Sequence, residues 1–87
     1  MPTRRVTIRV HNGAHARPVA ELARLAIAHA APVTLATSHG VVVELSSVLA
    51  VMDLALTEGD EVVLSTADSA DADRTLDTMV AVLAPEH

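Results

Sequence analysis

The sequence contains no cysteine and no phenylalanine, tyrosine or tryptophan. Without cysteine, the chain can form no disulfide scaffold, no cysteine-ligated zinc site and no thiol nucleophile. Without aromatic rings, it lacks the stacking platforms with which proteins hold single-stranded nucleic acids. These two absences exclude disulfide-rich, thiol-dependent and base-stacking classes of protein.

Long apolar runs are absent as well. No run approaches the roughly 20 residues of a membrane span, and no basic start followed by an apolar stretch indicates a signal peptide. The chain has 87 residues, 51% of them hydrophobic. A chain of this size buries roughly 60–70% of its unfolded surface, enough for one modest core. We therefore expect a single domain over residues 1–87 that is soluble, cytoplasmic and not inserted in a membrane.

Charge is unevenly distributed along the chain. All six basic residues are arginine, and five of them lie within residues 1–31, where the only acid is Glu21. Residues 32–87 hold one arginine and ten acids, and the formal net charge is −5. Overall acidity argues against a nucleic-acid partner, because such binding depends on neutralising phosphates. The positive first third favours an acidic protein partner or a small anionic group instead.

Alternation and helical spacing predict seven elements in the order βαββαβα. Strands are expected at 4–10, 33–37, 41–45 and 61–66. A first helix begins around Pro18 and is stopped by Pro32, and a second covers 48–56 with Ser46 or Ser47 as its N-cap. Asp68 or Ser69 caps a last helix. Strands separated by helices on one side predict an α+β two-layer sandwich.

The segment from Asn12 to Pro18 carries the chemistry, because His15 stands just before the start of the first helix. Unpaired N–H groups make a helix start an anion site, and Arg17 adds a donor fork suited to phosphate oxygens. The positive helix end disfavours the imidazolium form, so a ring nitrogen of His15 stays nucleophilic. These groups suit transient acceptance of a phosphoryl group. A surface histidine beside a solvated arginine is the alternative.

Residues 13–18, Gly-Ala-His-Ala-Arg-Pro, resemble the active-site signature of the HPr family. Its members are the histidine-containing phosphocarriers of the phosphoenolpyruvate-dependent sugar phosphotransferase system. Chain length, element order and a second segment, Leu45–Met52, resemble the family too. The resemblance implies an HPr-like open-faced β-sandwich: a four-stranded antiparallel sheet with three helices on one face, in a monomer.

The resemblance also implies a role for each residue of the signature. His15 accepts a phosphoryl group on Nδ1 from phospho-enzyme I and donates it to the IIA domains of sugar permeases. Arg17 stabilises the phosphate, and the backbone N–H groups of Ala16 and Arg17 cradle it. The chain is then a phosphotransfer intermediate that needs no cofactor, rather than a classical enzyme.

A protein-binding surface follows from the same resemblance, and we call it the docking face. Two helices supply its residues, and it includes an arginine and an apolar patch. Its members are Ala20, Arg24, Ile27, Val48, Leu49 and Met52. The alternative for the last three is that they form the core of a short amphipathic helix.

Ser47 stands where many family members carry a regulatory serine that a kinase phosphorylates. A phosphate there would add negative charge to the docking face and weaken binding of an acidic partner. The alternative is an ordinary N-cap hydroxyl. Ser46 replaces a lysine that is common in the family, and Ala50 and Ala55 replace frequent glycines, which obscures recognition by such a kinase.

The other polar residues give weaker signals. No pair among His11, His29, His39 and His87 has the spacing of a zinc site, so we expect no metal. We expect Asp71, Asp73 and Asp77 to be solvated charges at the start of the last helix.

Two other functions remain open from the sequence. One is a regulatory interaction protein of the same fold that acts through Ser47. The other is an acylphosphatase-like domain in which Arg17 clamps an anion beside Asn12. A carrier for a nitrogen-related or dihydroxyacetone-linked phosphotransferase branch also remains open, as do the permeases served.

Overall fold

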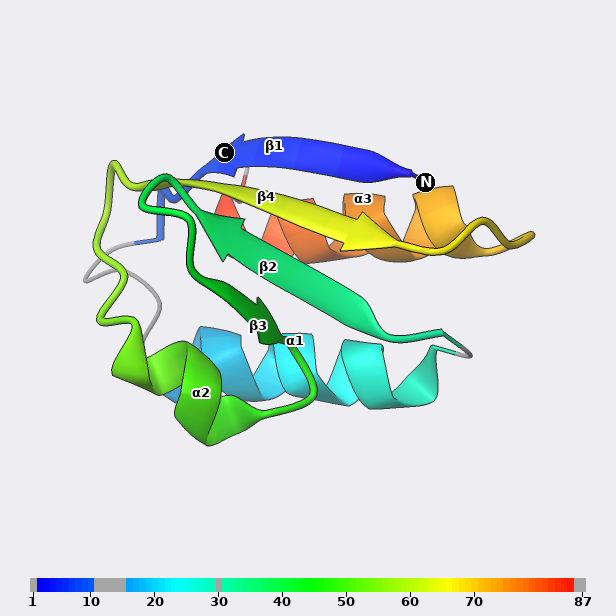
Figure 1. The fold of residues 1–87 in the computed structure, drawn as a ribbon, viewed down its shortest axis with the longest axis horizontal. Helices are drawn as coiled ribbons and strands as arrows, with labels where there is room; N and C mark the ends of the chain where they lie inside the picture. Colours follow the sequence, from blue (N-terminus) through cyan, green and yellow to red (C-terminus); the bar gives the residue numbers. More distant parts are fainter. Residues whose placement is uncertain (1, 11–15, 30, 86–87) are drawn as a thin grey trace.

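The chain forms a four-stranded antiparallel sheet covered on one face by three helices (Figure 1). The computed structural model describes residues 2–10, 16–29 and 31–85. The elements are β1 (Thr3–Thr7), α1 (Ala16–Ala28), β2 (Val33–Thr37), β3 (Val42–Glu44), α2 (Val48–Asp53), β4 (Glu61–Thr66) and α3 (Ala72–Leu83). The strand order is β1-β4-β2-β3. The predicted α+β open-faced sandwich is confirmed.

Side-chain alternation along the strands separates a core face from an uncovered face. In the centre of the sheet, Val62 of β4 pairs with Val6 of β1, and Leu64 of β4 pairs with Leu35 of β2. These four side chains are buried beneath the helices. Val63, between the two β4 residues, points to the opposite face, because successive strand residues alternate. The period of two in the sequence therefore decides which side of the sheet the helices cover.

The helices close the core with apolar residues spaced three and four apart. All are at most 6% exposed: Val19, Leu22, Ala23 and Ala26 of α1, and Leu76, Met79 and Leu83 of α3. Val80, four residues after Leu76, is half-buried. Ala30, four residues after Ala26, lies outside the described residues.

Several predicted boundaries are wrong by a few residues. The first strand ends at Thr7, although Ile8 remains buried and its backbone bonds to the segment before β4: Ile8 N donates to Asp60 O at 2.8 Å. α1 ends at Ala28, before Pro32, and β3 is confined to Val42–Glu44. α2 ends at Asp53 rather than at residue 56, and Ala55 adopts a φ of +50° that no helix continues through.

The helix caps confirm one prediction and correct another. Ser47 is the N-cap of α2, and its Oγ accepts a hydrogen bond from Ala50 N at 3.3 Å. The predicted cap of α3 at Asp68 or Ser69 is wrong, because a turn comes first: Ala72 N donates to Ser69 O at 3.3 Å. Asp71 is the N-cap there and makes no side-chain capping bond.

Replacing Ser47 with alanine is expected to lower the free energy of unfolding by about 0.5–1 kcal/mol, because one backbone N–H of α2 loses its capping acceptor. Denaturant unfolding monitored by circular dichroism measures this change. Ser46→Ala is the matched control, since Ser46 is also exposed and precedes the cap. Equal losses in the two variants would show that the cap contributes nothing specific.

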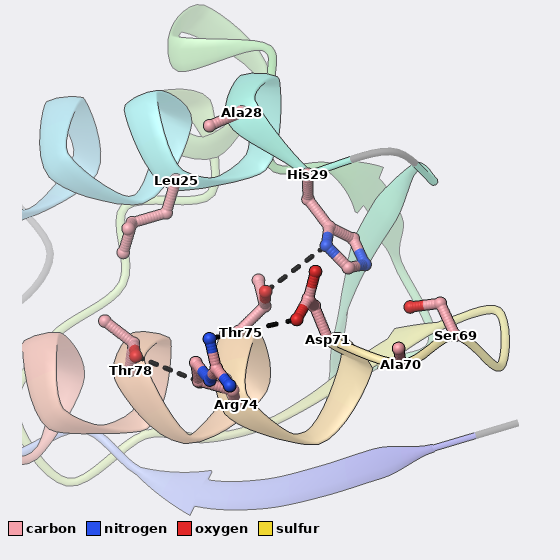
Figure 2. Close-up of a pocket in the computed structure, with 9 residues that line it drawn as sticks. All are labelled: Leu25, Ala28, His29, Ser69, Ala70, Asp71, Arg74, Thr75 and Thr78. Atoms are coloured by element: carbon pink, nitrogen blue, oxygen red, sulfur yellow. Dashed lines mark hydrogen bonds and ion pairs between the residues drawn. The ribbon is translucent and has the colours of Figure 1, made fainter.

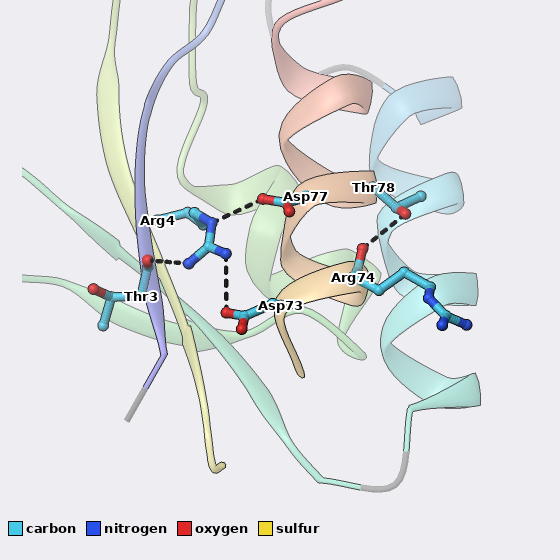
Figure 3. Close-up of polar contacts among 6 residues, drawn as sticks. All are labelled: Thr3, Arg4, Asp73, Arg74, Asp77 and Thr78. Carbon is cyan, nitrogen blue, oxygen red and sulfur yellow. Dashed lines mark hydrogen bonds and ion pairs between the residues drawn. The ribbon is translucent and has the colours of Figure 1, made fainter. Parts of the chain in front are cut away.

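We expected the acids at the start of α3 to be solvated charges only, but two of them form ion pairs. Arg4 of β1 donates from Nη2 to Asp73 Oδ1 at 2.9 Å and from Nε to Asp77 Oδ1 at 2.8 Å (Figure 3). The hydrogen bond to Asp77, followed by that to Asp73, raises the pKa of Arg4. Both carboxylates remain exposed, but they tie α3 to the edge strand β1. Asp71 lies 3.9 Å from Arg74 Nη1.

Candidate phosphate-binding and docking site

Arg17 projects into solvent from the first turn of α1. The helix starts at Ala16, and Pro18 is its third residue, where a missing N–H costs no hydrogen bond. Pro18 and Val19 are buried and seat the turn against the core, which leaves Arg17 exposed. His15 and Asn12 lie outside the described residues, so the structure places Arg17 and the helix start but not the histidine.

The first turn of α1 is positively charged and lacks an acid to offset the charge. Within the described ranges, Arg17 makes no hydrogen bond or ion pair. Its guanidinium fork is therefore available to a ligand that carries oxygens, beside first-turn N–H groups that have no partner within the helix. Such a combination favours an anion, and a phosphate matches the planar fork.

The chain before residues 11–15 is held in place by backbone hydrogen bonds. Ile8 O accepts from Gly59 N at 2.7 Å, and Arg9 N donates to Leu83 O at 2.8 Å, at the end of α3. On the other side, Pro18 and Val19 anchor the start of α1. The described residues on either side of 11–15 are thus held by backbone hydrogen bonds and by burial.

The apolar members of the docking face are exposed on two helices that contact each other. Ile27 of α1 is 70% exposed, and on α2 Leu49 is 78% exposed, while Val48 and Met52 are each 38% exposed. Ala20 and Arg24 are exposed as well. Figure 1 shows α2 beside α1, on the helical side of the sheet. The buried residue of α2 is Val51, so the core does not account for the other apolar side chains.

This surface also contains an ion pair within α1 that we did not predict from the sequence. Arg24 donates to both carboxylate oxygens of Glu21, from Nε at 3.1 Å and from Nη2 at 2.5 Å. The hydrogen bond from Arg24 lowers the pKa of Glu21, and the same bond raises the pKa of Arg24. The spacing of three residues was the signal that could have revealed the pair.

A cleft of about 390 Å³ lies between the end of α1 and the start of α3 (Figure 2). His29 Nδ1 and Thr75 Oγ1 lie 3.2 Å apart and link the two helices across it. With a rise of about 1.5 Å per residue, the α1 side of the cleft, from Leu25 to His29, lies roughly 12–18 Å along the helix axis from Arg17. This cleft is therefore separate from the first turn of α1.

Two further observations concern metal ions and membrane-spanning helices. Among the residues that the structure describes, no three histidine, aspartate or glutamate side chains gather in a way that could hold a metal ion. In the same part of the chain, no helix is both long enough and apolar enough to cross a membrane.

Comparison with known proteins connects this geometry to one family. A family model described as "PTS HPr component phosphorylation site" matches residues 2–84. The phosphocarrier protein HPr of Streptomyces coelicolor is 37% identical over 84 residues, which cover 97% of this chain and 89% of the relative.

Solved structures show the same likeness. The phosphocarrier protein HPr from Bacillus anthracis is similar with a TM-score of 0.84 and 28% identity, over 94% of this chain and 95% of that protein. The histidine-containing phosphocarrier protein of a mycoplasma has the same fold, with a TM-score of 0.83 and 24% identity, over 98% of this chain and 100% of the other.

Proposed function

The chain belongs to the HPr family of phosphocarriers of the phosphotransferase system, and we propose that it accepts a phosphoryl group from phospho-enzyme I and passes it to IIA domains of sugar permeases. His15 carries the group on Nδ1. The observation that carries the proposal is Arg17, exposed in the first turn of α1 and two residues after the histidine of the signature.

Neither the phosphoryl transfer from enzyme I nor the transfer to the IIA domain requires a cofactor. In the first, the lone pair of His15 Nδ1 forms a bond to phosphorus while the bond between phosphorus and enzyme I breaks, and the imidazole keeps its proton on Nε2. In the second, the Nδ1–P bond breaks as a nucleophile of the IIA domain attacks in line. The Arg17 guanidinium and the N–H groups of Ala16 and Arg17 stabilise the charge on the phosphoryl oxygens.

We expect the docking face to bind the two protein partners of this relay. Arg24, which pairs with Glu21 in the free protein, is the basic side chain among the exposed side chains of Ile27, Leu49 and their neighbours. An acidic surface with an apolar centre would be complementary to it, and we expect enzyme I and the IIA domains to present such a surface. Small interfaces of this kind form and dissociate readily, as a relay in the cytoplasm requires.

The test is a reconstituted relay with phosphoenolpyruvate, enzyme I, this chain and a IIA domain. We expect the IIA domain to become phosphorylated only when the chain is present. IIA domains of a sugar permease and of the nitrogen-related branch, assayed in parallel, tell the two branches apart. Phosphorylation of this chain without onward transfer to any IIA domain contradicts the second half of the proposal.

Phosphorylation of Ser47 remains a prediction of the sequence. The serine is exposed at the N-cap of α2, next to Val48 and Leu49 of the docking face. A phosphate there would place negative charge on the surface that we assign to acidic partners.

A further inference from the structure

We infer that Glu21 tunes the affinity of the docking face for its acidic partners by competing with them for Arg24. The inference rests on the proposed function, because it takes the phosphoryl donor, enzyme I, as the partner that binds this face. Glu21 itself lies outside the six residues of the docking face.

The first support is the geometry of the pair. Two hydrogen bonds, at 3.1 Å and 2.5 Å, occupy two nitrogens of the Arg24 guanidinium with both oxygens of Glu21. A bidentate contact of this kind is the arrangement in which a partner's carboxylate would bind arginine. Glu21 therefore occupies Arg24 in the free protein as a partner's carboxylate would in the complex.

The second support is that Arg24 is the one charged member of the docking face; the other five members are apolar. Glu21 is the only acid in α1, so no other residue of that helix can pair with Arg24. The state of this single ion pair therefore decides whether the docking face presents a free positive charge.

The third support is exposure, which makes the pair exchangeable. The Glu21 side chain is 42% exposed and the Arg24 side chain is 65% exposed. Solvated pairs of this kind are weak, so a partner's carboxylate can displace Glu21 at modest cost. Glu21 then stands unpaired next to that acidic surface and repels it, which weakens the complex further.

The position of Arg17 adds a consequence for the phosphate site. Glu21 lies four residues after Arg17 and three before Arg24, so helical spacing puts it within reach of either arginine. In the structure it pairs with Arg24. The pair thus holds the only acid of α1 away from the arginine that we assign to the phosphate.

The experiment compares Glu21→Gln with wild type as a substrate of enzyme I, with phosphoenolpyruvate as the donor. The control is Glu61→Gln. Glu61 lies 3.7 Å from Arg5, on the uncovered face of the sheet, and both side chains are exposed. Both substitutions remove one negative charge and release one arginine, but only one does so beside the docking face. Steady-state rates give KM and kcat at low and at high salt.

We expect Glu21→Gln to lower KM two- to fivefold at low salt with kcat unchanged, and the difference to disappear at high salt. We expect Glu61→Gln to match wild type. An unchanged or raised KM for Glu21→Gln overturns the inference, as does an equal decrease in both variants, which would reflect net charge alone. If no variant is phosphorylated, including wild type, the proposed function fails and this inference fails with it.

Discussion

Replacing Arg17 with alanine is expected to lower kcat/KM for phosphorylation by enzyme I by about 10²–10³-fold. Removing one preorganised donor to a developing oxyanion typically costs about 2.7–4 kcal/mol of transition-state stabilisation. Arg17 is exposed, and the first turn of α1 contains no acid that could pair with it instead of the phosphate. Rapid-quench measurement of phosphoryl transfer at several chain concentrations gives the value.

Two controls separate phosphate binding from general electrostatics. Arg17→Lys keeps the charge but loses the fork, so we expect roughly a tenfold decrease, smaller than that of Arg17→Ala. Arg74→Ala removes another exposed arginine, on α3, and we expect a change of less than about threefold. Equal decreases for Arg17→Ala and Arg74→Ala would rule out a specific role for Arg17.

The second large effect is on stability, from Leu22→Ala. Leu22 of α1 is fully buried, and truncating such a leucine costs about 2–5 kcal/mol through lost burial and the cavity left behind. For a chain of this size the total stability is only about 4–13 kcal/mol, so a large share is lost. Chemical denaturation measures the difference in the free energy of unfolding.

Leu49→Ala is the matched control, because the same atoms are removed from a side chain that is 78% exposed. We expect less than about 0.5 kcal/mol of lost stability but roughly a fivefold higher KM with enzyme I, since about 1 kcal/mol of apolar contact is lost on docking. A loss of several kcal/mol in Leu49→Ala would assign this side chain to the core instead.

The sequence predicted the element order and the buried face of most elements because those depend on local patterns. Val62 and Leu64 of β4 are buried, as their alternation predicts, and Leu76 and Met79 of α3 are buried, as their helical spacing predicts. Boundaries are set by competition between the ends of elements and the loops. The end of α2 depends on the positive φ of Ala55, which alanine rarely adopts, so the residue type gave no warning.

The candidate site, too, could be predicted only in part from the sequence. Arg17 was predicted from its place at a helix start, and the docking face from the family resemblance. Its α1 members lie off the core stripe, which agrees with their exposure. The spacing of Glu21 three residues before Arg24 was a signal that we did not use. The bonds from Arg4 to Asp73 and Asp77 join residues 69 and 73 positions apart. No local pattern encodes such contacts, since they depend on how α3 lies against β1.

The central claim is that His15 carries the phosphoryl group. Its most direct test is intact-mass spectrometry under alkaline conditions, after incubation with phosphoenolpyruvate and enzyme I, for wild type, His15→Ala and His39→Ala. His39 is the control because it is an exposed histidine in the turn between β2 and β3. We predict one acid-labile phosphate on wild type and His39→Ala and none on His15→Ala. A phosphate that persists in His15→Ala, or none on wild type with active cognate enzyme I, contradicts the account.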